Sequence, residues 1–237
     1  MQYVVPQTLT FAIIVGPGGY LLSFLIAWML AQLPKTLRTV LALIVYTPSL
    51  AGGVLIGVIW KSIFSGDQWG YLNAFLMKFG LINAPISWLT NPKYLLGITI
   101  FVALWSSFGI GFLSILSALC NLDPELYEAA RIDGAGRFQC MRYITLPSIK
   151  TTIIILTIMN IGWLLGAGFD QGLLLGNASI IDRAEVLGTY IYNRSLGAKY
   201  PDYGLSIAAG ALQSAVSIVL LVSVNFISKK ANDTSIL

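Results

Sequence analysis

The sequence contains no histidine, and only 10% of its 237 residues are charged. Soluble domains carry about 25% charged residues, so this little charge cannot cover a water-facing surface. The absence of histidine excludes a histidine base, a histidine metal ligand and the usual serine triad. No stretch fits G-x-x-x-x-G-K-[ST], so the chain carries no P-loop for ATP. We therefore expect neither catalysis nor a bound cofactor, and any ATP chemistry must belong to another chain.

Cysteine is scarce as well, with only Cys120 and Cys140 present. Two cysteines without a histidine are a poor ligand set, so no metal site is expected. Both are interpreted below as lying on the cytoplasmic side, where thiols stay reduced and no disulfide forms.

Charge is missing altogether from five long windows. Each window approaches or exceeds the roughly 20 apolar residues that an α-helix needs to cross a bilayer. None shows the strict alternation of a membrane β-strand. The sequence therefore predicts an all-α integral membrane protein with five transmembrane helices, over 1–34, 39–60, 94–122, 151–169 and 203–228. The positive residues are scattered between these windows and form no basic stripe, which argues against nucleic-acid binding.

Two windows contain helix-breaking residues. The run from Gly16 to Gly19 includes Pro17, so it should kink or break the first helix, or mark its start near Gly18. Pro48 with the pair Gly52–Gly53 should kink the second helix. No positively charged stretch precedes the first window, so no cleavable signal peptide is expected.

The positive-inside rule orients the chain. Taking the turn at Lys35 and Arg38 as cytoplasmic places 121–150 and the tail after 228 on the same side. These segments hold eight Lys or Arg residues, against six in the two outer loops, 61–93 and 170–203. The first outer loop is rich in aromatic residues, as is typical of a membrane-interface helix or belt.

The segment 121–150 predicts a helix–turn–helix between two spans. Asp123 is a good N-cap and Pro124 suits the first helical position. Gly134 permits a left-handed residue at the C-terminal end of a helix of about ten residues. A second short helix is predicted over 137–144, and Pro147 should hold Leu146 extended. An ordinary solvated loop remains the alternative on pattern alone.

This segment resembles the EAA loop of binding-protein-dependent ABC importer permeases. The matching positions are Glu128-Ala129-Ala130, Gly134, Ile144 and Leu146-Pro147, at the spacing of that motif. The segments 186–192 and 200–206 are similar to the last outer loop and last helix of carbohydrate permeases of the maltose type. The resemblance implies one transmembrane domain over 1–237. Such permeases usually have six spans or more, so one N-terminal helix is expected to be missing here.

The resemblance also implies partners and roles. The partners are a cytoplasmic ABC ATPase dimer, a second permease subunit that is a paralogue or a copy, an extracytoplasmic solute-binding protein and the lipid of the bacterial cytoplasmic membrane. Glu128 is expected to be the main polar contact with the ATPase. Gly134 would aim the coupling helix, with Arg131 and Asp133 as supporting contacts. The small side chains of Ala129 and Ala130 would allow close approach.

The solute path needs polar groups that face inward. A sugar ring has an apolar face and hydroxyl edges, so aromatic rings beside hydroxyl or amide groups suit it. The candidates are Trp105, Ser107, Phe108, Asn160 and Trp163. For Ser107 the alternative is helix–helix packing, for Asn160 an interhelical hydrogen bond, and for Trp163 contact with lipid. We find no countercharge for the path, which favours a neutral solute over a polyamine, amino acid or phosphate. A membrane-embedded enzyme and a passive channel are the alternatives from other classes.

Overall fold

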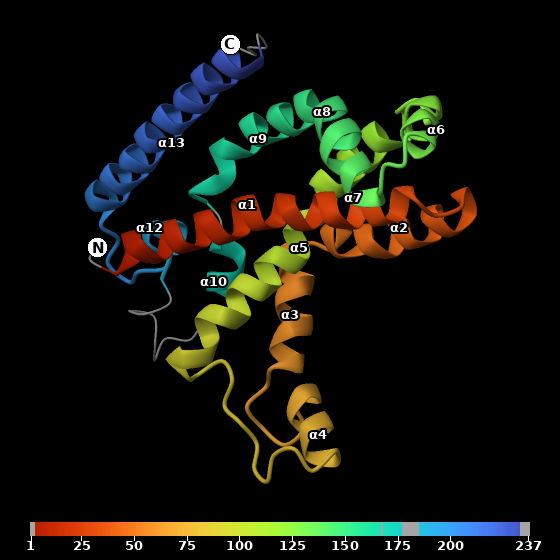
Figure 1. The fold of residues 1–237 in the computed structure, drawn as a ribbon. Coiled ribbons are helices and arrows are strands. Elements are labelled where there is room, and N and C mark those ends of the chain that lie inside the picture. The colour runs from red at the N-terminus through yellow and green to blue at the C-terminus, as the bar shows by residue number, and fades with distance from the viewer. Residues whose placement is uncertain (1–2, 167, 177–184, 233–237) are drawn as a thin grey trace.

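The computed structural model describes residues 3–166, 168–176 and 185–232, without the side chains of 108, 110, 161–164 and several residues near the C-terminus. All regular elements of the described ranges are helices, and these ranges contain no strand (Figure 1). In chain order the elements are α1 (Val4–Ala31), α2 (Lys35–Leu50), α3 (Gly53–Ile63), α4 (Tyr71–Lys78), α5 (Pro92–Cys120), α6 (Pro124–Ile132), α7 (Arg137–Cys140), the π-helical turn η1 (Met141–Thr145), α8 (Leu146–Ser148), α9 (Lys150–Leu164), α10 (Phe169–Leu175), α12 (Leu187–Ser195) and α13 (Tyr203–Asn232).

Two of these helices are each long and apolar enough to cross a membrane, namely α1 and the Tyr203–Phe226 part of α13. Three further pairs of helical segments qualify if each bent pair counts as one span, which gives up to five spans in the described ranges. The pair α2 and α3 is bent by 95°, at Ala51 and Gly52. The predicted kink near Pro48 and Gly52–Gly53 is thus confirmed, although the chain turns just after α2 and not at Pro48 itself.

The first helix runs unbroken through the glycine-rich run. The predicted break between Gly16 and Gly19, and the alternative start near Gly18, are wrong, because α1 is helical from Val4 to Ala31 with Pro17 inside it. Transmembrane helices tolerate proline and glycine where neighbouring helices support the backbone. Here α1 packs along α5, and a Cβ on Gly19 would lie only 3.4 Å from Ser107 Oγ. The glycines therefore let two helices approach closely.

The main core lies between α1, α2, α5 and the start of α9. Its fully or nearly fully buried members include Ala27, Phe112, Ile115 and Ile149. Burying such side chains contributes about 1.5–3 kcal/mol each in water, although lipid weakens this driving force between membrane helices. By contrast only 6% of the apolar window of α13 is buried, because this helix packs on α12 and α9 along one side. Its other side is left for lipid or for another chain.

The connection between α6 and α9 corrects one prediction. Leu146 is not extended but helical, with φ −60° and ψ −45°, and the chain stays helical from Arg137 through Ser148. A π-helical turn ends at Thr145, two residues before Pro147, and its wider ring accommodates a residue that lacks an N–H group. The change of direction comes later, as a 63° bend between the segments 137–148 and 150–160.

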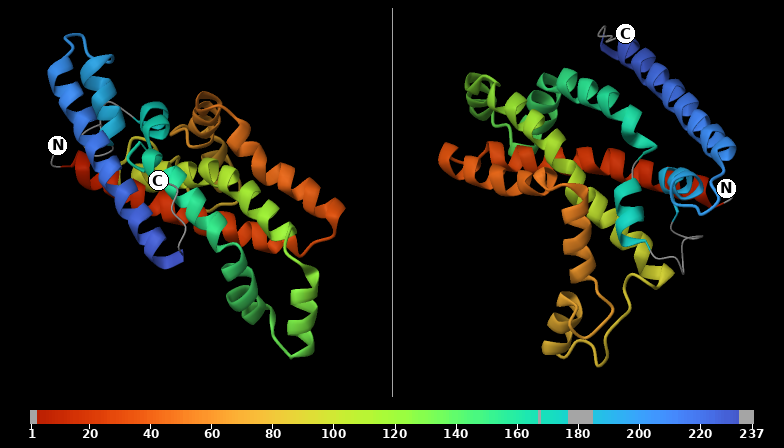
Figure 2. Two further views of the ribbon diagram at one scale, coloured as in Figure 1. Left: turned by 90° about the horizontal axis from the view of Figure 1, so that it is seen from above. Right: turned by 180° about the vertical axis from the view of Figure 1, so that it is seen from behind.

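The loop that contains α4 is built around Asn73, which is fully buried. Asn73 Nδ2 donates to the carbonyl oxygens of Ser65, Asp67 and Ile86 at 3.0–3.1 Å, and Asn73 Oδ1 accepts from the Ile86 N–H and from Trp88 Nε1. The loop is therefore an ordered unit. It lies on the opposite side of α1 from α6, as Figure 1 and the right panel of Figure 2 show.

Candidate functional site

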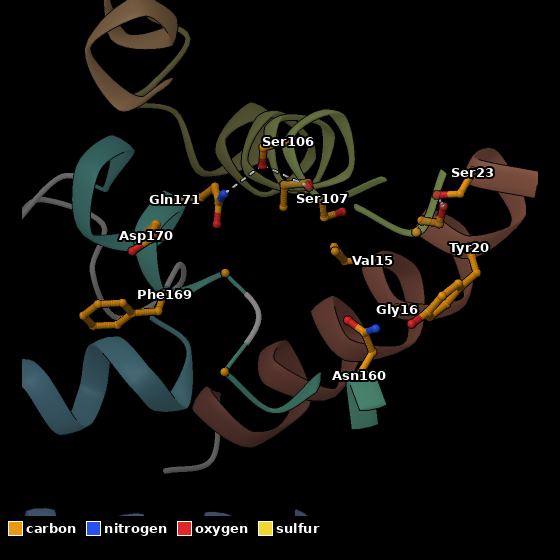
Figure 3. Close-up of a pocket in the computed structure, with 15 residues that line it drawn as sticks. Val15, Gly16, Tyr20, Ser23, Ser106, Ser107, Asn160, Phe169, Asp170 and Gln171 are labelled. Atoms are coloured by element: carbon orange, nitrogen blue, oxygen red, sulfur yellow. Dashed lines mark hydrogen bonds between the residues drawn. The ribbon is translucent and has the colours of Figure 1, made fainter. Parts of the chain in front are cut away.

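A cavity of about 520 Å³ lies among α1, α5, α9 and α10 (Figure 3). Several lining residues are glycines, so a bound molecule could reach backbone groups as well as polar side chains. Its polar lining consists of hydroxyls, amides and one carboxylate: Tyr20, Ser23, Ser106, Ser107, Asn160, Gln171 and Asp170. Such a lining can donate and accept several hydrogen bonds at once.

On one wall, α1 and α9 are joined at a single carbonyl group. The Tyr20 hydroxyl donates to the Leu156 carbonyl oxygen at 2.6 Å, and Asn160 Nδ2 donates to the same oxygen at 3.0 Å. Both side chains lie beside each other in Figure 3. The Tyr20 bond joins α1 to α9 beside the cavity, whereas the Asn160 bond lies within α9 and orients the Asn160 side chain.

On the next wall, Ser106 of α5 connects three helices. Its backbone carbonyl accepts a hydrogen bond from Ser49 Oγ of α2 at 2.8 Å. Its hydroxyl accepts a longer one from Gln171 Nε2 of α10 at 3.4 Å, and donates to the Val102 carbonyl at 2.9 Å. Gln171 thus extends along the cavity wall towards α5, as the dashed line in Figure 3 shows.

The third wall is set by the start of α10. Gly168 has φ +85°, which other L-residues rarely adopt, and a Cβ there would lie 2.8 Å from Phe11 Cδ1. This turn places Phe169 and Asp170 on the cavity. A Cβ on Gly53 would lie 3.0 Å from Asp170 Oδ2, so the carboxylate lies beside the first residue of α3. The positive end of a helix dipole stabilises a negative charge at that place.

A second candidate site is the α6 turn, which comprises α6 and the residues around it from Asp123 to Phe138. Asp123 Oδ1 accepts from the Glu125 N–H at 3.0 Å and caps the helix. Gly134 has φ +80°, and the Ala135 N–H donates to the Ala130 carbonyl at 2.9 Å, which closes the C-terminal end. These features confirm the predicted N-cap, helix and left-handed glycine.

The position of α6 is fixed by one side-chain contact. The hydroxyls of Tyr127 and Thr145 are hydrogen-bonded at 2.9 Å, which ties α6 to the π-helical turn η1. Around this anchor, large apolar side chains are exposed: Leu126, Phe138 and above all Ile132, which is 87% exposed. Glu128, Arg131 and Asp133 are exposed beside them. An exposed apolar patch with a charged rim marks an interaction surface.

Comparison with known proteins decides the family. Residues 19–233 match the family described as binding-protein-dependent transport system inner membrane component. The chain belongs to this family. Its members are permease subunits of ABC transporters and not enzymes.

Curated relatives of this permease come from several bacteria. Protein LplB of Bacillus subtilis is 36% identical over 186 residues, which are 78% of this chain and 57% of the relative. The polygalacturonan/rhamnogalacturonan transport system permease protein YteP of the same species is 33% identical, over 81% of this chain and 59% of the relative. The lactose transport system permease protein LacF of Rhizobium radiobacter is 30% identical, over 79% of this chain and 62% of the relative. The permease thus spans about three fifths of the length of these relatives.

Solved structures show the same fold. The permease superposes on a chain of a bacterial ABC transporter involved in the import of the acidic polysaccharide alginate, with a TM-score of 0.88 and 30% identity. The match covers 97% of this chain and 79% of the other. A second structure of a bacterial alginate transporter, in complex with an alginate pentasaccharide-bound periplasmic protein, matches with a TM-score of 0.89 at 30% identity, over 99% of this chain and 80% of the other. The all-helical fold predicted from the sequence is confirmed.

The permease brings two of the five predicted path residues together. Ser107 and Asn160 both line the cavity. Trp105 does not line it but packs edge-on against Trp60, with ring centroids 5.2 Å apart. The side chains of Phe108 and Trp163 lie outside the described part of the structure.

Sequence reasoning missed five polar groups of the cavity, which are Tyr20, Ser23, Ser106, Asp170 and Gln171. Tyr20 follows the glycine-rich run that favours a helix break, and Asp170 and Gln171 directly follow the uncharged window 151–169. The sequence offers no countercharge for the path, whereas this cavity has one carboxylate, that of Asp170, in its described lining. A usable signal was the sequence Gly166-Ala167-Gly168 shortly before Asp170, since glycines often accompany a break beside a binding site.

Proposed function

We propose that this permease forms part of the path by which an ATP-driven importer moves a sugar or oligosaccharide across the bacterial cytoplasmic membrane. In this proposal the whole range 1–237 acts as one transmembrane domain. The segment 121–150 lies on the cytoplasmic side, and the loops 61–93 and 170–203 lie outside. The observation that carries the proposal is the α6 turn, which is firmly anchored yet presents exposed apolar side chains.

The α6 turn is proposed as the docking element for a separate ABC ATPase. Glu128 provides the main polar contact, and Arg131 and Asp133 support it. Ala129 and Ala130 let the surface of the ATPase approach the helix, and Gly134 sets the direction in which the helix ends. Ile132 adds the most exposed apolar side chain of this surface. The motif alone does not predict this contribution.

ATP then acts as a ligand that binds one global state of the importer more tightly than the other. Closure of the ATPase dimer would move the α6 turn, and the path would open alternately to the two sides. The remaining partners are a second permease subunit and an extracytoplasmic solute-binding protein. One matching alginate transporter was solved in complex with a periplasmic protein, which supports the second partner.

The sugar assignment rests on relatives and on the cavity together. Relatives are named for lactose, for polygalacturonan/rhamnogalacturonan and for arabinooligosaccharides. The cavity offers hydroxyl and amide groups from Tyr20, Ser107, Asn160 and Gln171, which match the hydroxyls of a sugar. Ser107 and Asn160 are the predicted path residues that contribute to it; Trp105, Phe108 and Trp163 remain proposed path residues only.

The docking role is tested by Ile132→Asp in the importer expressed with its own ATPase and second permease. A buried isoleucine contributes about 1.5–3 kcal/mol, so the charged variant should weaken binding of the ATPase by at least tenfold. The measurement is the amount of ATPase that co-purifies with the permease. Solute uptake should fall in parallel.

Leu196→Asp is the matched control, because Leu196 is 75% exposed in the second outer loop. It should retain the ATPase in normal amounts. Combining Glu128→Lys with Gly134→Pro should abolish transport while membrane insertion stays normal. Normal co-purification and uptake in both Ile132→Asp and the double variant would refute the docking role.

A further inference from the structure

The charge of the cavity limits which saccharide can enter it. Asp170 is the one charged side chain in the described lining of about 520 Å³, and it is exposed. All other polar groups of this lining are neutral hydroxyls and amides. A saccharide with only hydroxyl groups can bond to all of them, whereas one that carries carboxylates must place like charges together.

The surroundings of Asp170 strengthen this point. Its Oδ2 atom lies beside Gly53, the first residue of the 11-residue helix α3. The N-terminal end of a helix is the place where a chain without cationic side chains would hold an anion. Here the chain's own carboxylate already takes that place. An anionic solute therefore meets a negative charge at the point that would otherwise attract it.

The position of Asp170 is also fixed by its neighbours. Gly168, in the left-handed conformation, packs against Phe11. On the far side, α10 packs on α3 so closely that a Cβ on Gly57 would lie 2.7 Å from the Leu174 side chain. These contacts, together with those of α10 on α5 and α12, fix the place from which the Asp170 side chain extends.

We propose that Asp170 is a specificity-determining residue that excludes anionic saccharides, so that the solute of this permease is a neutral saccharide. This inference rests on the proposed sugar function and adds the charge of the solute to it. The names of the relatives do not decide this point, because an acidic polysaccharide and lactose both occur among them.

The test is direct binding to the complete permease–ATPase complex in lipid nanodiscs, without the solute-binding protein. The probes are galactotriose and trigalacturonate, which share ring geometry and differ by three carboxylates. Because Asp170 is exposed, one pair of unit charges about 8 Å apart repels only weakly, but the three carboxylates of trigalacturonate together suffice for about a tenfold change in affinity at low ionic strength. We expect the wild type to prefer galactotriose by tenfold or more, and Asp170→Asn to reduce this ratio about tenfold.

Two further variants are measured beside Asp170→Asn. Gln171→Glu adds a carboxylate next to the first and should increase the preference for galactotriose. Asp202→Asn is the matched control, because it makes the same chemical change outside the cavity and Asn can still accept the hydrogen bond of the Leu205 N–H. It should leave the ratio unchanged.

The outcomes distinguish a failure of the proposed charge selectivity from a failure of the proposed sugar function. Equal binding of both probes by the wild type, or a ratio that Asp170→Asn does not change, would overturn this inference and leave the sugar function standing. Binding of neither probe would overturn the sugar function itself and this inference with it. Loss of the second permease subunit from the Asp170→Asn complex would assign the carboxylate to a subunit contact and would also overturn the inference.

Discussion

The loop around α4 should lose its order when Asn73 is replaced by alanine. In the native loop Asn73 is 0% exposed, and its carboxamide makes five hydrogen bonds to the backbone and to Trp88. In Asn73→Ala, two donors remain without a partner, the Ile86 N–H and Trp88 Nε1. Each buried donor without a partner costs about 1–3 kcal/mol, so together they cost about 2–6 kcal/mol.

The lower part of that range is expected, because water can reach this loop more easily than a closed core. A loss of about 2–3 kcal/mol corresponds to a local opening that is roughly 30- to 150-fold more frequent. Hydrogen exchange of peptides within 65–88, followed by mass spectrometry in nanodiscs, measures this opening. Peptides from α5 and α6 should keep their exchange rates, because the damage is local.

Asn83→Ala is the matched control, since Asn83 is an exposed asparagine in the same loop. It should leave the exchange rates unchanged. Asn73→Asp should resemble Asn73→Ala, because a carboxylate would face the carbonyl oxygens of Ser65, Asp67 and Ile86 without a donor. Native exchange of 65–88 in both Asn73 variants would refute the view that this one side chain holds the loop.

Two further predictions concern glycines with positive φ. Gly134→Ala and Gly80→Ala place the same strain, about 1–2 kcal/mol, at residues whose added Cβ meets nothing within 4 Å. Only Gly134→Ala should reduce the uptake driven by ATP, and an equal loss in Gly80→Ala would contradict a specific role of the α6 turn. Gly168→Ala adds a 2.8 Å approach to Phe11 and should displace α10, which faster hydrogen exchange of 169–175 would report. Unchanged exchange there would show that α10 is not held by this contact.

Local rules explain which parts of the structure were predictable. Asp123, Pro124 and Gly134 each act on their own turn of helix, so the bounds of α6 could be predicted from the sequence. The uncharged windows likewise reflect a property of each segment alone. Leu146 shows the limit of such rules. The preference against a helical residue before proline is modest, and a π-helical turn at Met141–Thr145 overrides it.

The composition of the cavity depends on contacts between distant segments. The direction of Trp105 follows from its contact with Trp60, which α3 brings there only after the 95° turn from α2. The helix α10 has seven residues and is too short to register as a transmembrane window, so pattern alone places Asp170 in a loop. The glycines before Asp170 signal a break in the chain, but they do not say which way the carboxylate faces. The directions of the Trp105 ring and of the Asp170 carboxylate can both be predicted only when the position of the neighbouring helix is known.

The contacts also form a continuous route between the two sites. Tyr127 of α6 is hydrogen-bonded to Thr145 in the π-helical turn, which continues through α8 and the bend into α9. On α9, the Leu156 carbonyl is held by Tyr20 and Asn160, and both of these line the cavity. If α6 is the docking point, a force on it reaches this carbonyl through helices alone. The bend before α9 is the place where the route can change shape, because a packed helix transmits displacement whereas a bend converts it into rotation.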